Sequence, residues 1–154
     1  MIEIYDTKLW GIKFNLDAEY IGEKSIILDV DGFLDVSIND HDESVHVICP
    51  CFIVFVAVSG LSMSISDGSF QNEPISYCGG VHLVEIEKNT ETTPYSWLIQ
   101  LADESYIKIQ CDSVRVEVFS QFKREIVRAN TFLHLSVRTS LMLNNLSPSD
   151  VYVL

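Results

Sequence analysis

Hydrophobic and polar residues alternate along most of this chain, in short runs separated by turn residues. A period of two is typical of strands that bury one face and expose the other. The clearest runs are Leu9–Leu16, Ile26–Val30, Leu34–Ile38, Leu61–Ile65, Val81–Glu87, Ser96–Leu101, Ile107–Cys111 and Val114–Val118. Eight to ten short strands at this spacing predict a mainly β fold, an antiparallel β-sandwich or a barrel-like sheet.

The most apolar stretch is Val45–Ser66, around which we expect the fold to be organised. Nearly every residue of Phe52–Val58 is apolar, which indicates a strand segment buried on both faces. A membrane-spanning helix needs about 20 consecutive apolar residues. Pro50 and the pair Ser59-Gly60 bracket a much shorter run, so this stretch is interpreted as a core strand followed by a half-buried one.

An Asp-Gly pair between two alternating runs predicts a hairpin in the first third of the chain. Ile26–Val30 and Leu34–Ile38 flank Asp31-Gly32, the strongest short-range hairpin signal in the sequence. On this prediction Asp29 and Asp35 lie on the face opposite the apolar one. That face of the ribbon is expected to be acidic and solvated.

The pattern changes from Gln121 onward. Apolar residues there recur every three or four positions, which predicts one C-terminal amphipathic helix and therefore an α+β variant of the mainly β class. They are Phe122, Ile126, Ala129, Leu133, Val137 and Leu141. Thr131–Leu143 also alternates and fits a strand, and the tail after residue 145 fits either a short edge segment or a frayed end. No repeat or linker divides the chain, so residues 1–154 are interpreted as a single domain.

Charge is the strongest compositional signal. The formal net charge is −12, and residues 1–43 hold eleven acids against three bases, whereas residues 121–138 hold four bases and one acid. A field of this sign disfavours nucleic acids and anionic membranes and favours cationic partners. The N-terminus lacks a basic region followed by an apolar one, so we expect a cytoplasmic protein.

Candidate chemistry is weak. No nucleophile, phosphate-binding or dinucleotide motif is present, which favours a non-enzymatic protein without cofactors. Cys49-Pro50-Cys51 could join Cys78, His46 and His82 in a zinc site, but reduced, buried thiols are the preferred interpretation. The N-terminal acids do not match a calcium-loop spacing and are interpreted as a solvated acidic face.

An alternative function is the binding, or hydrolysis, of a small apolar ligand between the sheets. Its motive is a set of aromatic residues expected to point inward. They are Trp10, Phe14, Phe52, Phe55 and Trp97.

Three segments carry a resemblance to a known class of proteins. IILDVDGFLDVSI, CFIVFVAVSGLSMSI and YIKIQCDSVRVEV resemble the strands of small β-rich immunity proteins from bacterial polymorphic toxin and contact-dependent inhibition systems. The resemblance implies a protein that binds and neutralises a cognate toxin in the cytoplasm without catalysis. Together with the charge, it predicts a cationic toxin domain, such as a nuclease, docked on the N-terminal acids. These are Asp17, Glu19, Asp29, Asp31, Asp35, Asp40, Asp42 and Glu43.

Overall fold

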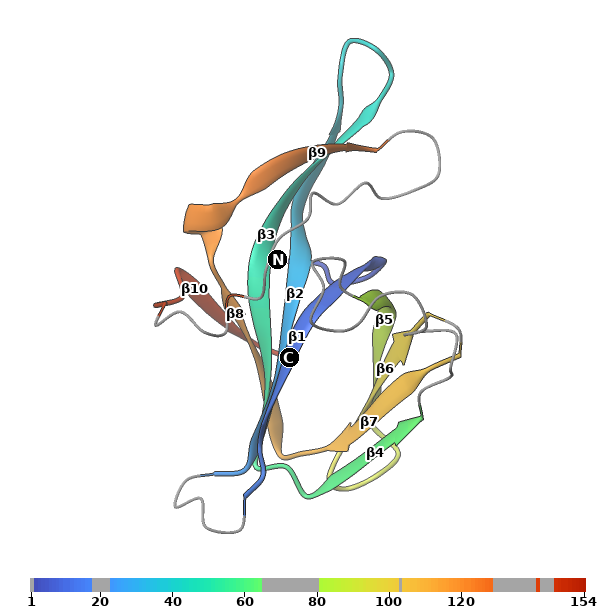
Figure 1. Ribbon diagram of the computed structural model, residues 1–154, viewed down its shortest axis with the longest axis vertical. Helices are drawn as coiled ribbons and strands as arrows, with labels where there is room; N and C mark the ends of the chain where they lie inside the picture. Colours follow the sequence, from blue (N-terminus) through green and yellow to red (C-terminus); the bar gives the residue numbers. More distant parts are fainter. Residues whose placement is uncertain (1, 18–22, 65–80, 103, 129–140, 142–145) are drawn as a thin grey trace.

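A computed structural model describes residues 2–17, 23–64, 81–102, 104–128, 141 and 146–154 (Figure 1). Within these ranges the chain forms ten strands and one short 3-10 helix. The strands are β1 Thr7–Asn15, β2 Ser25–Ile38, β3 Ser44–Val56, β4 Gly60–Ser64, β5 Val81–Asn89, β6 Ser96–Leu101, β7 Tyr106–Gln110, β8 Ser113–Val118, β9 Arg124–Arg128 and β10 Asp150–Val153, and the helix is η1 Ser120–Phe122. All strand pairs are antiparallel.

The strands join into one sheet with the order β10-β8-β3-β2-β1-β5-β6-β7-β4, and β9 adds to β3 beside β8. β3 bends into β4, and β7 bends into β8 alongside it. The N–H of Ser59 donates to the carbonyl of Gln110 at 2.9 Å, and the N–H of Asp112 donates to that of Val56 at 3.1 Å. Pairing therefore continues across the bend, where Ala57 adopts a left-handed φ of 54°.

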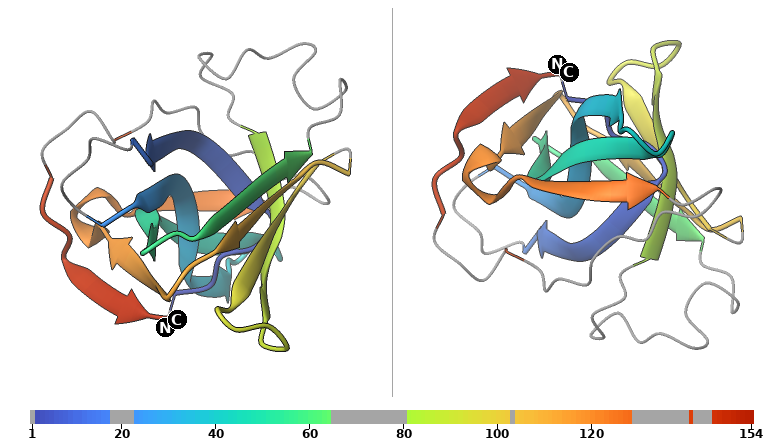
Figure 2. Two further views of the ribbon diagram at one scale, coloured as in Figure 1. Left: turned by 90° about the horizontal axis from the view of Figure 1, so that it is seen from below. Right: turned by 90° about the horizontal axis from the view of Figure 1, so that it is seen from above.

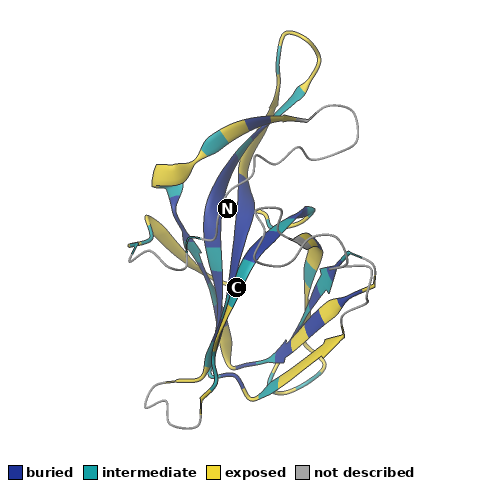
Figure 3. Cartoon of the chain, in the orientation of Figure 1, coloured by how far each residue is buried: buried dark blue, intermediate teal, exposed yellow. Residues whose placement is uncertain are grey.

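β1 joins the two halves of the sheet at the other side. It pairs with β2 over Leu9–Asn15 and with β5 over Thr7–Leu9. The sheet thus curls around one main core, as the end-on views in Figure 2 show. The core residues come from both halves of the sheet and are dark blue in Figure 3. They include Leu28, Ile53, Phe55, Leu83, Trp97, Ile99, Ile107, Ile109, Val114 and Val116.

A second, smaller apolar cluster lies on the opposite face of β2 and β3. Trp10 from β1, Phe33 from β2, Ile48 from β3 and Ile126 from β9 form this minor core. The ring of Phe33 also packs edge-on to His46, with the ring centroids 5.4 Å apart. Both faces of the central strands are consequently buried along much of their length.

The predicted mainly β fold and the positions of the strand runs are confirmed, but the predicted hairpin at Asp31-Gly32 is wrong. β2 runs unbroken from Ser25 to Ile38, with a bulge between Phe33 and Asp35. A Cβ atom at Gly32 would lie 2.5 Å from the Ile2 side chain and 2.9 Å from Cys51 Sγ. A larger residue here would force these side chains to shift, so Gly32 allows their close approach to the backbone and does not mark a turn.

The predicted helix does not form where the structure describes its first part. Residues 120–122 form a single 3-10 turn, and Arg124–Arg128 form a strand that pairs with Ser44–Ile48. Most of the remaining stripe, residues 129–140 and 142–145, lies outside the described residues. The tail does add an edge strand, since β10 pairs with β8. Among the described residues, no helix is long and apolar enough to cross a membrane.

Candidate protein-binding surface

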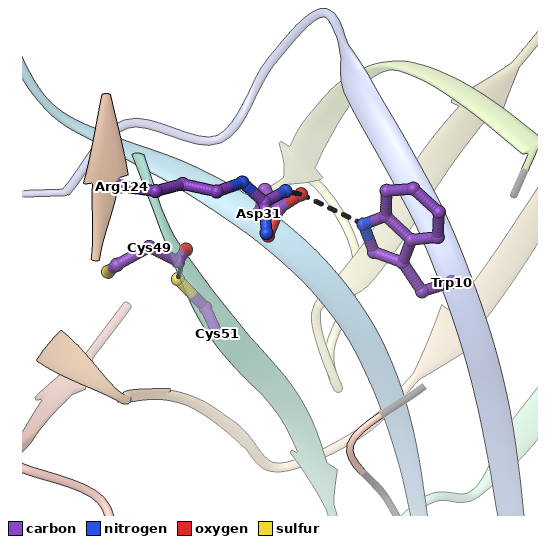
Figure 4. A network of polar contacts seen from close by, with 5 residues as sticks. All are labelled: Trp10, Asp31, Cys49, Cys51 and Arg124. Carbon is purple, nitrogen blue, oxygen red and sulfur yellow. Dashed lines mark hydrogen bonds and ion pairs between the residues drawn. The ribbon is translucent and has the colours of Figure 1, made fainter. Parts of the chain in front are cut away.

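Two of the eight predicted binding acids are buried, which corrects the prediction of a solvated face. Asp29 has an exposed fraction of 0% and Asp31 of 1%. Asp31 accepts a hydrogen bond from Trp10 Nε1 at 2.9 Å and pairs with Arg124 Nη2 at 3.0 Å (Figure 4). Asp29 Oδ2 accepts a hydrogen bond from the backbone N–H of Leu141 at 2.7 Å. These carboxylates hold later parts of the chain against β2 and are not available to a partner.

The bulge in β2 also separates Asp29 from Asp35. Residues paired across two strands have their side chains on the same face of the sheet. Asp29 pairs with Phe52, and Asp35 pairs with Val47. Phe52 and Val47 differ by an odd number of positions on β3, so their side chains point to opposite faces. Asp29 and Asp35 therefore cannot belong to one acidic face.

Four other predicted acids do gather at one place. Asp35, Asp40, Asp42 and Glu43 are all exposed. They lie on the far part of the β2–β3 pair, whose loop projects beyond the rest of the sheet at the top of Figure 1, while β9 pairs with β3 over Ser44–Ile48. We call this segment, Leu34–Val47, the arm. Asp17 is exposed but follows β1 near the opposite end of β2, and Glu19 lies outside the described residues.

The loop at the end of the arm is ordered by one side chain. Asn39 Oδ1 accepts hydrogen bonds from the backbone N–H groups of His41 (2.9 Å) and Glu43 (3.0 Å). Asn39 Nδ2 donates to Glu43 Oε2 at 3.1 Å, and Asp42 takes the left-handed conformation with a φ of 57°. Asx turns of this kind fix short loops. The backbone of the loop and the carboxylate of Glu43 are thus held in place before any partner arrives.

Exposed apolar side chains lie beside these acids. Val36 is 49% exposed and Ile38 is 74% exposed. Val36 pairs with His46, which in turn pairs with Ile126 of the minor core, so Val36 extends the apolar surface of that core outward. The alternation in the sequence assigned Val36 and Ile38 to a buried face, and no local signal showed that the arm extends beyond its covering.

The four carboxylates of the arm have no cationic partner among the described residues. The three ion pairs formed there are His82–Asp6, Arg115–Glu117 and Arg124–Asp31. Arg124, the basic residue at the start of β9, is already engaged by Asp31. Within the described part of the chain, the arm therefore combines an apolar strip with carboxylates that form no ion pair.

The residues considered for zinc do not converge. Cys49 and Cys51 point into the main core, whereas His46 lies on the other face of β3. His82 Nε2 lies 2.7 Å from Asp6 Oδ1, and Cys78 falls outside the described residues. In the part of the chain that the structure describes, no three His, Cys, Asp or Glu side chains gather as a metal site.

Three cysteines are buried free thiols, as the sequence predicts. Cys51 donates a hydrogen bond to the carbonyl of Cys49 at 3.4 Å (Figure 4). The side-chain hydrogen bond with Cys49 is the larger cause and burial the second, and together they raise the pKa of Cys51 far above the ordinary value. Burial raises the pKa of Cys111 to about 11. Thiols held protonated in this way are poor nucleophiles.

The aromatic residues considered for an internal ligand site are dispersed. Phe55 and Trp97 lie in the main core with ring centroids 6.3 Å apart. Phe52 packs on Phe119 on the other face, and Trp10 belongs to the minor core. Phe14 is 45% exposed, so the expectation that all five point into one space is wrong.

No protein-family model matches this chain, and neither the curated proteins nor the solved structures contain a significant match to it.

Proposed function

We propose that this chain is a non-enzymatic binding protein that neutralises a cationic toxin domain in the cytoplasm, as an immunity protein does, and that the arm is its binding surface. The observation that carries the proposal is the exposed apolar strip of Val36 and Ile38 beside the carboxylates of the ordered loop. An apolar centre with a charged rim is the arrangement of many protein interfaces.

The two parts of this surface have different physical roles. Exposed carboxylates attract a cationic partner over several ångströms and raise the association rate, an effect that salt screens. The apolar strip contributes when it is covered, at roughly 25 cal/mol for each Å² removed from water. Loop order lowers the entropy lost on binding, because the Asn39 side chain already fixes the positions of His41 and Glu43.

The test starts from the genes that neighbour the gene for this chain, where the proposal expects a toxin domain to be encoded. Cells that express this toxin domain should survive when the chain is co-expressed. The triple variant Asp40→Asn, Asp42→Asn, Glu43→Gln should bind the purified domain about tenfold more slowly at low salt, with the difference shrinking as salt rises. Association rates by stopped-flow fluorescence give this measurement.

A matched control removes the same charge elsewhere. Glu85, Glu87 and Glu91 are exposed residues of β5 and its following loop, outside the arm, and β1 separates β5 from β2 in the sheet order. Their replacement by Gln should reduce the association rate much less than the arm triple. A gene neighbourhood without a toxin, death of the co-expressing cells, or equal effects of the two triples would overturn the proposal.

A further inference from the structure

Among the described residues, no strand pairs with the outer edge of β2 along the arm. β1 pairs with β2 only over Ser25–Val30, and Glu3 forms a single antiparallel bridge with Phe33. Beyond Phe33, no described strand pairs with that edge, while β3 pairs with the other side of β2 as far as Ile38. An exposed edge of this kind is able to pair with an added strand.

The register shows which backbone groups face this free edge. The N–H of Asn39 donates to the carbonyl of Glu43 at 3.0 Å, so these residues form a hydrogen-bonded pair. Such pairs alternate with non-hydrogen-bonded ones in an antiparallel ladder. Ser37 therefore directs its N–H and C=O toward β3, and Val36 and Ile38 direct theirs outward.

The outward N–H of Val36 is already occupied by an acceptor from its own chain. It donates to Asp35 Oδ1 at 2.8 Å. The carboxylate thus takes the place that a carbonyl of a neighbouring strand would take. Side chains that cover an edge in this way protect a sheet from indiscriminate pairing.

We propose that the arm recognises its partner by adding an extended segment of that partner, antiparallel, to the edge at Val36 and Ile38. This inference rests on the proposed function and specifies how the toxin domain would bind. The carbonyl of the added strand replaces Asp35 on the N–H of Val36, and the released carboxylate pairs with a Lys or Arg of that strand. The antiparallel direction is the same as that of the bridge that Glu3 forms with Phe33 on this edge of β2.

The two faces of the arm determine the sequence pattern of such a segment. Residues directly opposite Val36 and Ile38 share the apolar face, so they should be apolar. The residue between them lies on the face of Asp35 and should be basic. The fitting ligand is therefore a segment in which apolar and basic residues alternate.

The probe is the heptapeptide Lys-Val-Lys-Val-Lys-Val-Lys, acetylated and amidated, in two N-methylated forms of equal charge. In the proposed register the valines exchange backbone hydrogen bonds with Val36 and Ile38, and the N–H groups of the lysines face away. The form methylated on the backbone nitrogens of the lysines should bind to the arm. It should shift the amide resonances of Val36 and Ile38 in NMR titrations. The form methylated on the backbone nitrogens of the valines cannot donate these hydrogen bonds, so it should bind at least tenfold more weakly.

Two variants separate the backbone from the side chain. Val36→Pro removes the outward N–H, which proline tolerates at an edge position, and Val36→Ala keeps it. The alanine variant should retain the preference between the two peptides, and the proline variant should lose it. Equal binding of both peptides to the wild-type protein would overturn strand addition and leave a purely electrostatic surface. Binding of neither peptide would also overturn it. The survival assay with the unmodified chain and the association rate of the arm triple judge the proposed function separately.

Discussion

Arg124→Met is the substitution whose cost follows most directly from the buried ion pair. Asp31 is 1% exposed and pairs with Arg124, whose side chain is 25% exposed. Removal of Arg124 takes the cation away from this buried carboxylate, while the hydrogen bond from Trp10 Nε1 stays in place. Breaking a buried ion pair from one side costs about 3–5 kcal/mol, because the remaining charge is not compensated.

Removal of the other partner should cost less. Asp31→Asn keeps an oxygen that can accept from Trp10 and leaves a guanidinium that reaches water, so we expect a loss of about 1–2 kcal/mol. The double variant should be more stable than Arg124→Met alone, since no buried charge remains in it. Urea unfolding followed by circular dichroism gives the three free energies of unfolding. A cost below about 1 kcal/mol for Arg124→Met would refute the claim that this pair fastens β9 to β2.

Three further outcomes are expected. Gly32→Ala should lower the free energy of unfolding by about 1–3 kcal/mol, because the new methyl group overlaps the Ile2 side chain; an unchanged urea midpoint would contradict this contact. Since the pKa of Cys111 is raised to about 11, its thiol is protonated at pH 8, and iodoacetamide should label it over tenfold more slowly in the folded than in the unfolded protein. The rate at which Cys111 is labelled in the folded protein should keep rising between pH 9 and pH 11, as followed by peptide mapping with mass spectrometry. A plateau of this rate near pH 9 would show that the pKa is ordinary. Asn39→Ala should speed hydrogen exchange at the amides of His41 and Glu43 without changing global stability by more than about 1–2 kcal/mol, and unchanged exchange would show that Asn39 does not order the loop.

Alternation in the sequence predicts where strands lie because it is a local property. Ile26, Leu28 and Val30 alternate and are fully buried in the main core. What the alternation does not determine is whether the second face of the same strand is covered. Asp29 lies on that second face, and the group that hydrogen-bonds to it, the N–H of Leu141, is over a hundred residues away in the sequence.

One signal for this covering was present in the sequence. Phe52–Val58 is apolar at nearly every position, which predicts a strand buried on both faces, and β2 pairs directly with this part of β3. A neighbour of a doubly covered strand is covered too, so acids on β2 in that region require internal partners. The bulge at Phe33 has no comparable signal, because it depends on the match between two complete strands.

Hydrogen–deuterium exchange of this chain, alone and with the neighbouring toxin domain, tests most directly whether the arm is the binding surface. Mass spectrometry of peptides from residues 34–47 should show strong protection in the complex. Peptides from residues 85–91, which carry the control acids, should exchange at the same rate in both states. Protection confined to other parts of the chain, with residues 34–47 unchanged in a saturated complex, would contradict the account.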